Sequence, residues 1–198
     1  MVVAVLLHHV HLLVSDVPAV EEEYAGVGFA VVARYGYVGR EYEGFAPEVG
    51  WDELEERGFR LRLVELEQGG VNVVLMPSRF RERRLGHIGV VADPEERDRA
   101  IAAARRLGRS TRGGDVRRFV RTGGGFELEL TDSSRAASIT EGVGRLRIEA
   151  LEICCPDAGS AAETLDATLD RDARSRIDLR PSGKRFAELA GWRLEPAI

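Results

Sequence analysis

The chain has 198 residues, of which 44% are hydrophobic and 31% charged, which suits one compact domain or two small ones that pack closely. Its formal net charge of −5 argues against a nucleic-acid-binding protein, which usually presents a strongly basic face. The two cysteines are neighbours and form no disulfide framework, and the apolar opening (1–14) is too short to span a membrane. These features favour a cytoplasmic protein.

The first predicted element is an apolar strand that carries three of the four histidines, in HHVHLLVSD (8–16). Asp16 can cap a helix that runs to about Tyr24. Strand-like runs follow at 29–38, 59–67 and 71–77. The aromatic-rich segment 36–58 between them is interpreted either as a functional loop or as a surface insertion with a short helix at 51–57.

A second set of elements begins at HIGVVADPEERDRAIAAARRLG (87–108). Its strand ends at Asp93, Pro94 suits the first helical position, and Glu96 completes the spacing of a capping box. Strand-like runs then occupy 116–122 and 126–132.

A third beginning of the same kind is LEICCPDAGSAAETLDATL (151–169). Ser160 and Glu163 have capping-box spacing, so a helix is predicted from Ser160 onwards. Nothing like a full set of strands follows. The sequence therefore predicts a first module at 1–80, a second at 81–140 and a partial βαβ module at 141–198 that packs on the others.

The order of one strand, a helix and further strands occurs twice, which indicates an internal repeat. The module ends support it: GGVNVVLMPSR (69–79) can be laid on GGFELELTDSSR (124–135), so that Gly70 falls on Gly125 and Val74 on Glu129.

Side chains alternate between the two faces of a strand, and this places the candidate functional residues. His9 and His11 share one face of the first strand, and His8 points to the other. Glu127 and Glu129 share one face of the strand at 126–132.

If the two modules pair around a pseudo-twofold axis, His9 and His87 meet across a shared cavity, with a glutamate of 126–132 nearby. Two imidazoles and one carboxylate form the facial triad typical of non-haem iron(II) oxygen chemistry. The open positions of such an ion also let it polarise a carbonyl or stabilise an enolate.

The opening HVHLLVSDV…YAGVGF (9–29) resembles that of the vicinal oxygen chelate superfamily, which includes glyoxalases, extradiol dioxygenases, methylmalonyl-CoA epimerases and bleomycin-resistance proteins. His9 and Asp16 keep the family spacing, and His87 and Asp93 match with one residue fewer. The segment GFELEL (125–130) is similar to the closing strand that carries the family's glutamate ligand. The resemblance covers about residues 5–135 and implies an α+β fold, with two βαβββ modules forming an incomplete barrel.

Carried over by position, the resemblance implies His9, His87 and Glu129 as metal ligands. The family's fourth ligand falls on Val74, which cannot bind metal. This departure speaks against the four-ligand glyoxalase and epimerase pattern and favours the three-ligand dioxygenase pattern. The metal implied is Fe(II) first, then Mn(II), Zn(II) or Ni(II). The tyrosine and histidine that dioxygenases add near their closing strands are missing from DVRRFVRT (115–122).

Other residues have two interpretations each. His11 and Glu127 are candidates for acid–base catalysis, although His11 can also simply pack beside the site and Glu127 pair with an arginine. Arginines 117 and 121 share a face of their strand and can hold a carboxylate by bidentate contacts or be merely solvated. The aromatic segment is suited to stacking on a planar substrate. The candidate substrate-binding residues are Arg117, Arg121, Tyr35 and Tyr37.

The sequence therefore predicts a metal-dependent enzyme that acts on a small oxygen-rich molecule, either dioxygenase-like or a lyase or isomerase. The alternative is a non-catalytic small-molecule-binding protein of the bleomycin-resistance type. A third hypothesis is a degenerate structural or regulatory member whose C-terminal segment serves as an interaction surface. No nucleic-acid or membrane partner is expected, and a homodimer is possible.

Overall fold

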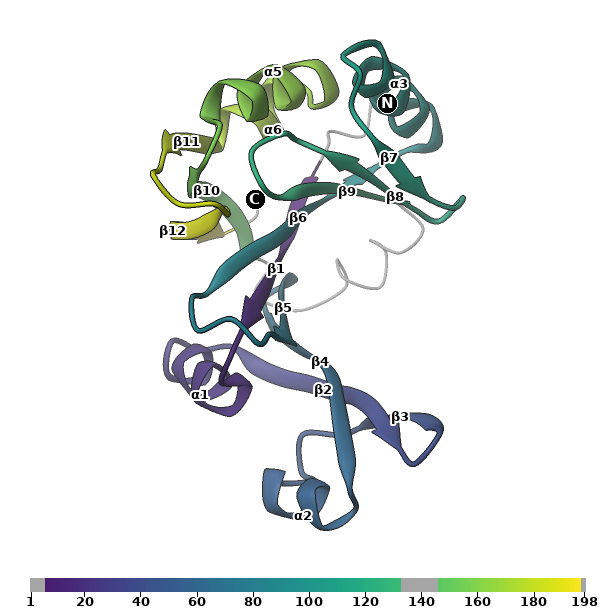
Figure 1. Cartoon of the computed structure of the whole chain (residues 1–198), viewed down its shortest axis with the longest axis vertical. Coiled ribbons are helices and arrows are strands. Elements are labelled where there is room, and N and C mark those ends of the chain that lie inside the picture. Colours follow the sequence, from purple (N-terminus) through teal and green to yellow (C-terminus); the bar gives the residue numbers. More distant parts are fainter. Residues whose placement is uncertain (1–5, 133–145, 197–198) are drawn as a thin grey trace. The chain divides into compact units, whose positions relative to one another are not determined.

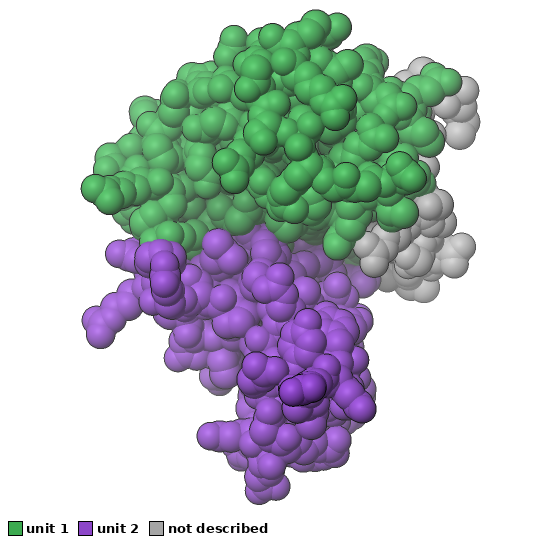
Figure 2. Space-filling view, turned by 45° about the vertical axis from the view of Figure 1, so that its right-hand side comes forward, with its two compact units in different colours: residues 1–10, 69–71, 84–198 green, residues 11–68, 72–83 purple. Residues whose placement is uncertain are grey.

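The computed structural model describes residues 6–132 and 146–196. Its residues divide into two compact units, coloured separately in Figure 2. Unit 1 takes the described residues of 1–10, 69–71 and 84–198, and unit 2 takes 11–68 and 72–83. Strand β1 (Leu6–Val14) contributes residues to both units, through Val10 to unit 1 and from His11 to unit 2.

Unit 2 contains most of the first module. Its elements besides β1 are α1 (Val17–Gly26), β2 (Ala30–Val38), β3 (Glu41–Phe45), α2 (Trp51–Glu56), β4 (Phe59–Gln68) and β5 (Val71–Pro77). The strand order is β3-β2-β4-β5-β1. Asp16 caps α1 as predicted, because its Oδ1 accepts the Ala19 N–H at 3.1 Å.

The segment 36–58 is not a loop, which corrects one of the two interpretations. Strand β2 runs on to Val38 and turns back into β3, so that Tyr37 pairs with Tyr42. The short helix predicted at 51–57 is present as α2. The sequence did not predict this hairpin, because glutamates and glycines interrupt its apolar residues.

The second module lies in unit 1. Its elements are β6 (Arg84–Ala92), α3 (Pro94–Arg106), β7 (Thr111–Gly113), β8 (Arg117–Arg121) and β9 (Glu127–Asp132). The strand order is β1-β6-β9-β8-β7, with β6 and β9 parallel. The predicted capping box is present: Asp93 accepts from the Glu96 N–H, and the Glu96 side chain accepts from the Asp93 N–H.

The two modules share one strand order, which confirms the internal repeat and the predicted α+β fold. In both, the first strand neighbours the last, and the remaining strands follow in reverse chain order. The orders are β1-β5-β4-β2 and β6-β9-β8-β7, and β3 and α2 are inserted in the first. Neither set of strands closes on itself, as expected for this fold. Residues 133–135 of the aligned module ends lie outside the described residues.

The C-terminal elements form a separate three-stranded sheet in unit 1 (Figure 1). They are β10 (Leu146–Cys155), α5 (Ala158–Thr168), α6 (Arg171–Ser175), β11 (Ile177–Pro181) and β12 (Glu188–Pro196). Strand β10 is parallel to β11 and antiparallel to β12. The boundary predicted at residue 140 lies outside the described residues, and the division into three modules stays a prediction.

The predicted start of the third helix was three residues late. Helix α5 is capped by Asp157, whose carboxylate accepts the Ser160 N–H at 2.8 Å. Ser160 is therefore already inside the first turn. Asp and Ser are comparably good caps, and the Ser160–Glu163 spacing drew attention away from the aspartate just before it.

Side chains alternate along β6 and β9, so one face of each strand packs into the core and the other face carries the site residues. Ile88 and Val90 on β6, and Leu128 and Leu130 on β9, are buried. The residues between them on both strands point to the opposite face. Helix α3 contacts β8 and β9, and its buried residues include Ala100, Ile101 and Ala104. Among the described helices none is long and apolar enough for a membrane span.

Candidate metal centre

Three side chains from neighbouring strands of unit 1 converge on one point: His9 of β1, His87 of β6 and Glu129 of β9. Their possible ligand atoms all lie within 4.8 Å of one another. The Nε2 atoms of the two imidazoles are 3.1 Å apart. Glu129 Oε2 lies 3.0 Å from Nε2 of His87 and 3.5 Å from Nε2 of His9. The structure thus brings together the three residues that the sequence predicts as metal ligands.

Register explains how the carboxylate and both imidazoles fit side by side. Parallel pairing of β6 with β9 puts Gly89, not His87, opposite Glu129. A Cβ on Gly89 would lie 1.9–2.4 Å from atoms of the His9 ring, far inside van der Waals contact. The His9 ring therefore occupies the space that the missing side chain leaves beside Glu129.

The two oxygens of Glu129 have different environments. Oε1 accepts hydrogen bonds from Arg117 Nε at 2.7 Å and Thr131 Oγ1 at 2.8 Å. Oε2 is buried, and among the described residues it has no hydrogen-bond donor in line with it. A buried acceptor without a partner is costly. A cation bound at Oε2 and the two facing nitrogens would remove that cost.

The protonation states suit a metal ligand set. Burial by itself raises the pKa of Glu129, but the imidazoles of His87 and His9 outweigh it and hold the pKa below its usual range. Burial lowers the pKa of His9, despite the opposing effect of Glu129. An ionised carboxylate and a neutral imidazole are the forms that coordinate metal. The residues therefore fit a divalent ion with nitrogen and oxygen ligands, such as Fe(II), Mn(II), Zn(II) or Ni(II).

A phenylalanine ring and an arginine lie close to the three predicted ligands. Phe119 of β8 lies opposite Glu129, and its ring meets the His87 ring edge to face at 5.4 Å. The Arg112 guanidinium lies 3.9 Å above the Phe119 ring centroid and pairs with Glu127.

Comparisons with known proteins are informative only at the level of structure. No protein-family model matches the chain, and the search of curated proteins found no match. A Mn(II)-bound glyoxalase from Novosphingobium aromaticivorans is similar, with TM-score 0.58 and 16% identity over 89% of this chain and 61% of that one. An extradiol ring-cleaving dioxygenase from B. fuscum gives TM-score 0.51 and 19% identity over 83% and 45%. Homoprotocatechuate 2,3-dioxygenase from Arthrobacter globiformis gives TM-score 0.52 and 16% identity over 90% and 60%.

The chain shares the fold of these glyoxalase and dioxygenase structures. This confirms the fold that the resemblance to the vicinal oxygen chelate superfamily predicted. The chain spans less than two thirds of these structures, 61%, 45% and 60% of their lengths.

The two arginines that were predicted to bind substrate have different surroundings. Arg117 is half-exposed and holds a predicted metal ligand, Glu129. Arg121 is largely exposed and lies 3.8 Å from Glu127. Glu127, a candidate acid–base residue, accepts from Arg112 as well, so the alternative role of arginine partner matches its contacts.

The remaining candidates, His11, Tyr35 and Tyr37, belong to unit 2, whereas the three predicted metal ligands belong to unit 1. His11 is the first residue of unit 2. Tyr35 and Tyr37 lie on β2, and both rings contact the ring of Tyr42. The Tyr35 ring stacks on it with the centroids 6.4 Å apart, and the Tyr37 ring meets it edge to face at a centroid distance of 5.2 Å. These aromatic contacts belong to the β2–β3 hairpin.

Sequence reasoning missed three residues that shape the centre. Thr131 lies two residues after Glu129 on the same face, a signal that alternation contained. His8 was assigned to the opposite face of β1, but its ring contacts that of His9. Gly89 has no signal of its own, because its role depends on the register between β6 and β9.

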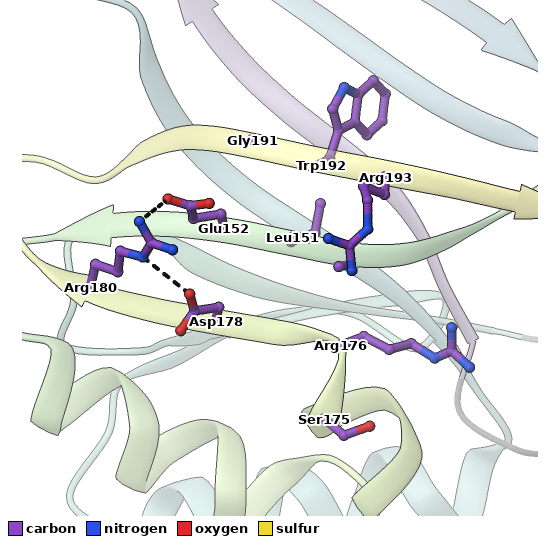
Figure 3. Close-up of a pocket in the computed structure, with 10 residues that line it drawn as sticks. Leu151, Glu152, Ser175, Arg176, Asp178, Arg180, Gly191, Trp192 and Arg193 are labelled. Atoms are coloured by element: carbon purple, nitrogen blue, oxygen red, sulfur yellow. Dashed lines mark hydrogen bonds and ion pairs between the residues drawn. The ribbon is translucent and has the colours of Figure 1, made fainter.

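A cavity of about 430 Å³ lies over the C-terminal sheet (Figure 3). Three arginines line it, and each is paired with acidic side chains: Arg180 with Glu152 and Asp178, Arg176 with Asp172 and Glu195, and Arg193 with Glu149. The pairing neutralises its arginines, and none of the metal-ligating residues lines it.

Proposed function

We propose that the chain is a metal-dependent enzyme that acts on a small organic molecule with two adjacent oxygen atoms. The observation that carries this proposal is the buried Glu129 Oε2, which has no donor in line with it and faces two imidazole nitrogens at 3.0 and 3.5 Å. A purely structural cluster would be expected to satisfy a carboxylate oxygen at this depth.

The ligands proposed are His9, His87 and Glu129. A divalent ion held there, Fe(II) first and then Mn(II), Zn(II) or Ni(II), would supply Lewis-acid or dioxygen chemistry at its open positions. Arg117 and Thr131 orient the carboxylate, since both donate to Oε1 and leave Oε2 for the ion. Gly89 makes room for the His9 ring.

We propose two reaction classes by analogy with the similar structures: lyase or isomerase chemistry, as in a glyoxalase, and ring cleavage, as in an extradiol dioxygenase. Three ligands without a fourth favour the dioxygenase-like class, because Val74 occupies the fourth position in the repeat alignment. Glu127 is engaged by Arg112 and Arg121, an arrangement that favours an ion pair over proton transfer.

For substrate binding we propose Arg117. Its side chain is 50% exposed, and its Nε is committed to Glu129. The remaining guanidinium N–H groups can donate to a carboxylate or another anionic oxygen of the substrate. The neighbouring Phe119 ring offers an apolar surface for a planar portion of the molecule.

The experiment is turnover by protein reconstituted with Fe(II) or Mn(II), against a panel of catechols, α-hydroxy ketones and thiohemiacetals. We expect product formation that needs the metal and is lost in Glu129→Gln. The Arg117→Met variant should raise KM for anionic substrates more than for neutral ones. Tight binding of a compound without turnover and without metal would contradict the enzyme and favour the bleomycin-resistance-type binding protein.

A further inference from the structure

Strand β11 forms an open edge of the C-terminal sheet. It lies parallel to β10, as β9 lies parallel to β6 in the second module. Beyond β9 that sheet continues through β8 and β7, whereas β11 is the last strand of its sheet among the described residues. At the other edge, β12 contacts β6, and the Leu85 N–H donates to the Ala187 carbonyl just before β12 at 2.8 Å. An open edge presents N–H and C=O groups that can accept another strand.

The hydrogen bonds to β10 show which backbone groups of β11 face the open edge. The Leu151 N–H donates to the Arg176 carbonyl at 2.7 Å, and the Ser182 N–H donates to the Cys155 carbonyl at 2.9 Å. Backbone groups of successive residues in a strand point to alternate sides, so the even-numbered residues from 176 to 182 bond to β10. The residues whose backbone groups face the open edge are Ile177, Leu179 and Pro181.

These backbone groups match a second copy of the same strand in antiparallel orientation. With Leu179 opposite Leu179 of the second copy, each Leu179 N–H can donate to the other's carbonyl, and each Ile177 N–H can donate to a Pro181 carbonyl. Proline has no N–H, so the Ile177 carbonyl gains no donor from the second copy. That carbonyl already accepts from Arg174 Nη1 at 2.8 Å. The pairing therefore gives a partner to every N–H and C=O of the three edge residues.

The side chains of β11 match a second copy as well. Asp178 and Arg180 are 61% and 57% exposed. In the antiparallel pair Asp178 lies opposite Arg180 of the second copy, at the closely spaced positions without hydrogen bonds, where opposite charges attract and like charges repel. The contrast is β3, an edge strand of the nine-stranded sheet. Paired with itself about its central residue, β3 would place Glu43 opposite Glu43.

We propose that β11 pairs antiparallel with β11 of a second copy, so that the two C-terminal sheets join into one continuous sheet in a homodimer. Asp178 also accepts from Arg180 of its own chain at 3.1 Å (Figure 3), so the charges of the two copies form one alternating network. The contact is small, and a weak dimer with a Kd on the order of 10 μM is expected. The proposal does not depend on the metal centre.

Sedimentation equilibrium of charge variants tests the pairing. We expect the wild type to approach twice the chain mass of 21.8 kDa as its concentration rises through the Kd. Asp178→Arg and Arg180→Asp should each raise the Kd at least about 10-fold, because each places like charges opposite one another in both pairs. A mixture of the two variants should form a heterodimer about as tight as the wild-type dimer, because the mixture restores opposite charges at both pairs.

Arg193→Asp is the matched control. Arg193 is 70% exposed and pairs with Glu149 at 3.0 Å, and it lies on β12, which β10 separates from β11. This variant should dimerise as the wild type does. A wild type that stays monomeric at about 1 mM would overturn the proposal. So would single variants that dimerise as well as the wild type, or a mixture of them that does not dimerise.

Amide hydrogen exchange locates the contact and reports on folding. The Leu179 N–H faces the open edge, so its exchange in the wild type should slow as the protein concentration rises. The Arg180 N–H, which is bonded to β10, should be protected at every concentration and in both charge variants, which shows that their sheet is intact. Exchange at Leu179 that does not change with concentration would place any dimer contact elsewhere and contradict the pairing.

Discussion

Gly89 shows how a residue without a side chain can shape the proposed metal centre. Its backbone has an ordinary strand conformation, so alanine would be tolerated there were it not for the His9 ring 1.9–2.4 Å from the added Cβ. The ring cannot keep its place beside Glu129 once that carbon is present.

We predict that Gly89→Ala weakens Mn(II) binding by at least about 10-fold while the protein stays folded. Calorimetric titration and circular dichroism measure the two effects. Gly183→Ala is the matched control, since a Cβ there meets nothing within 4 Å. Unchanged binding in Gly89→Ala would show that the ring position is not needed.

Tyr24 makes the stability of the folded protein depend on pH in the alkaline range. It is buried on α1, and burial raises its pKa from 10.0 to about 12. The folded protein therefore holds the phenolic proton more tightly than the unfolded chain does. This stabilisation is complete below about pH 10 and is lost as the pH rises toward about 12.

We predict that an ultraviolet titration resolves one tyrosine that ionises near pH 12, and that Tyr24→Phe removes this phase. The variant should also lose less stability than the wild type between pH 10 and pH 12. Should all tyrosines titrate together near pH 10 in the folded protein, Tyr24 is not held in an apolar environment.

At the scale of elements, a buried ion pair joins α1, β2 and the segment before α2. Arg34 of β2 donates to Glu21 of α1 through Nε at 3.0 Å and to the Val49 carbonyl through Nη1 at 2.9 Å. Trp51 Nε1 also donates to Glu21, at 3.3 Å. This network ties the segment 46–50, which belongs to no helix or strand, to α1 and β2.

We predict that Arg34→Met costs about 3–5 kcal/mol of unfolding free energy, because it leaves the buried Glu21 carboxylate without its cation, with only the Trp51 N–H as a side-chain donor. Adding Glu21→Leu should recover much of the loss. The exposed pair of Arg83 with Glu23 is the control, and Arg83→Met should cost less than about 1 kcal/mol. Equal losses in urea denaturation would mean that burial of the pair is unimportant.

Elements with strong local signals were predictable and those without them were not. Asp16 and the Asp93–Glu96 capping box mark helix starts by side-chain chemistry that acts over three residues. Strands β3 and β7 are short and carry no clear apolar alternation, so neither was predicted. The cap of α5 was misplaced because two acceptable caps, Asp157 and Ser160, lie within one turn.

At the scale of the whole molecule, the repeat made the fold predictable. Two similar segments end in the same way, and a repeated strand–helix–strand order leaves few arrangements for an apolar sheet. The same repeat predicts that His9 and His87 lie close to each other and to a glutamate of 126–132, and the family resemblance selects Glu129. What it could not supply was register, which places Gly89 beside Glu129, or the contact between His8 and His9. These depend on pairing between strands distant in the chain.

Titration of metal-free protein with Mn(II) tests the central claim most directly, using Glu129→Gln and, as a matched control on the same face of β9, Glu127→Gln. The account predicts about one ion per chain in the wild type and in Glu127→Gln, and none in Glu129→Gln. A wild type that binds no ion, or a Glu129→Gln variant that binds as well as the wild type, would contradict it.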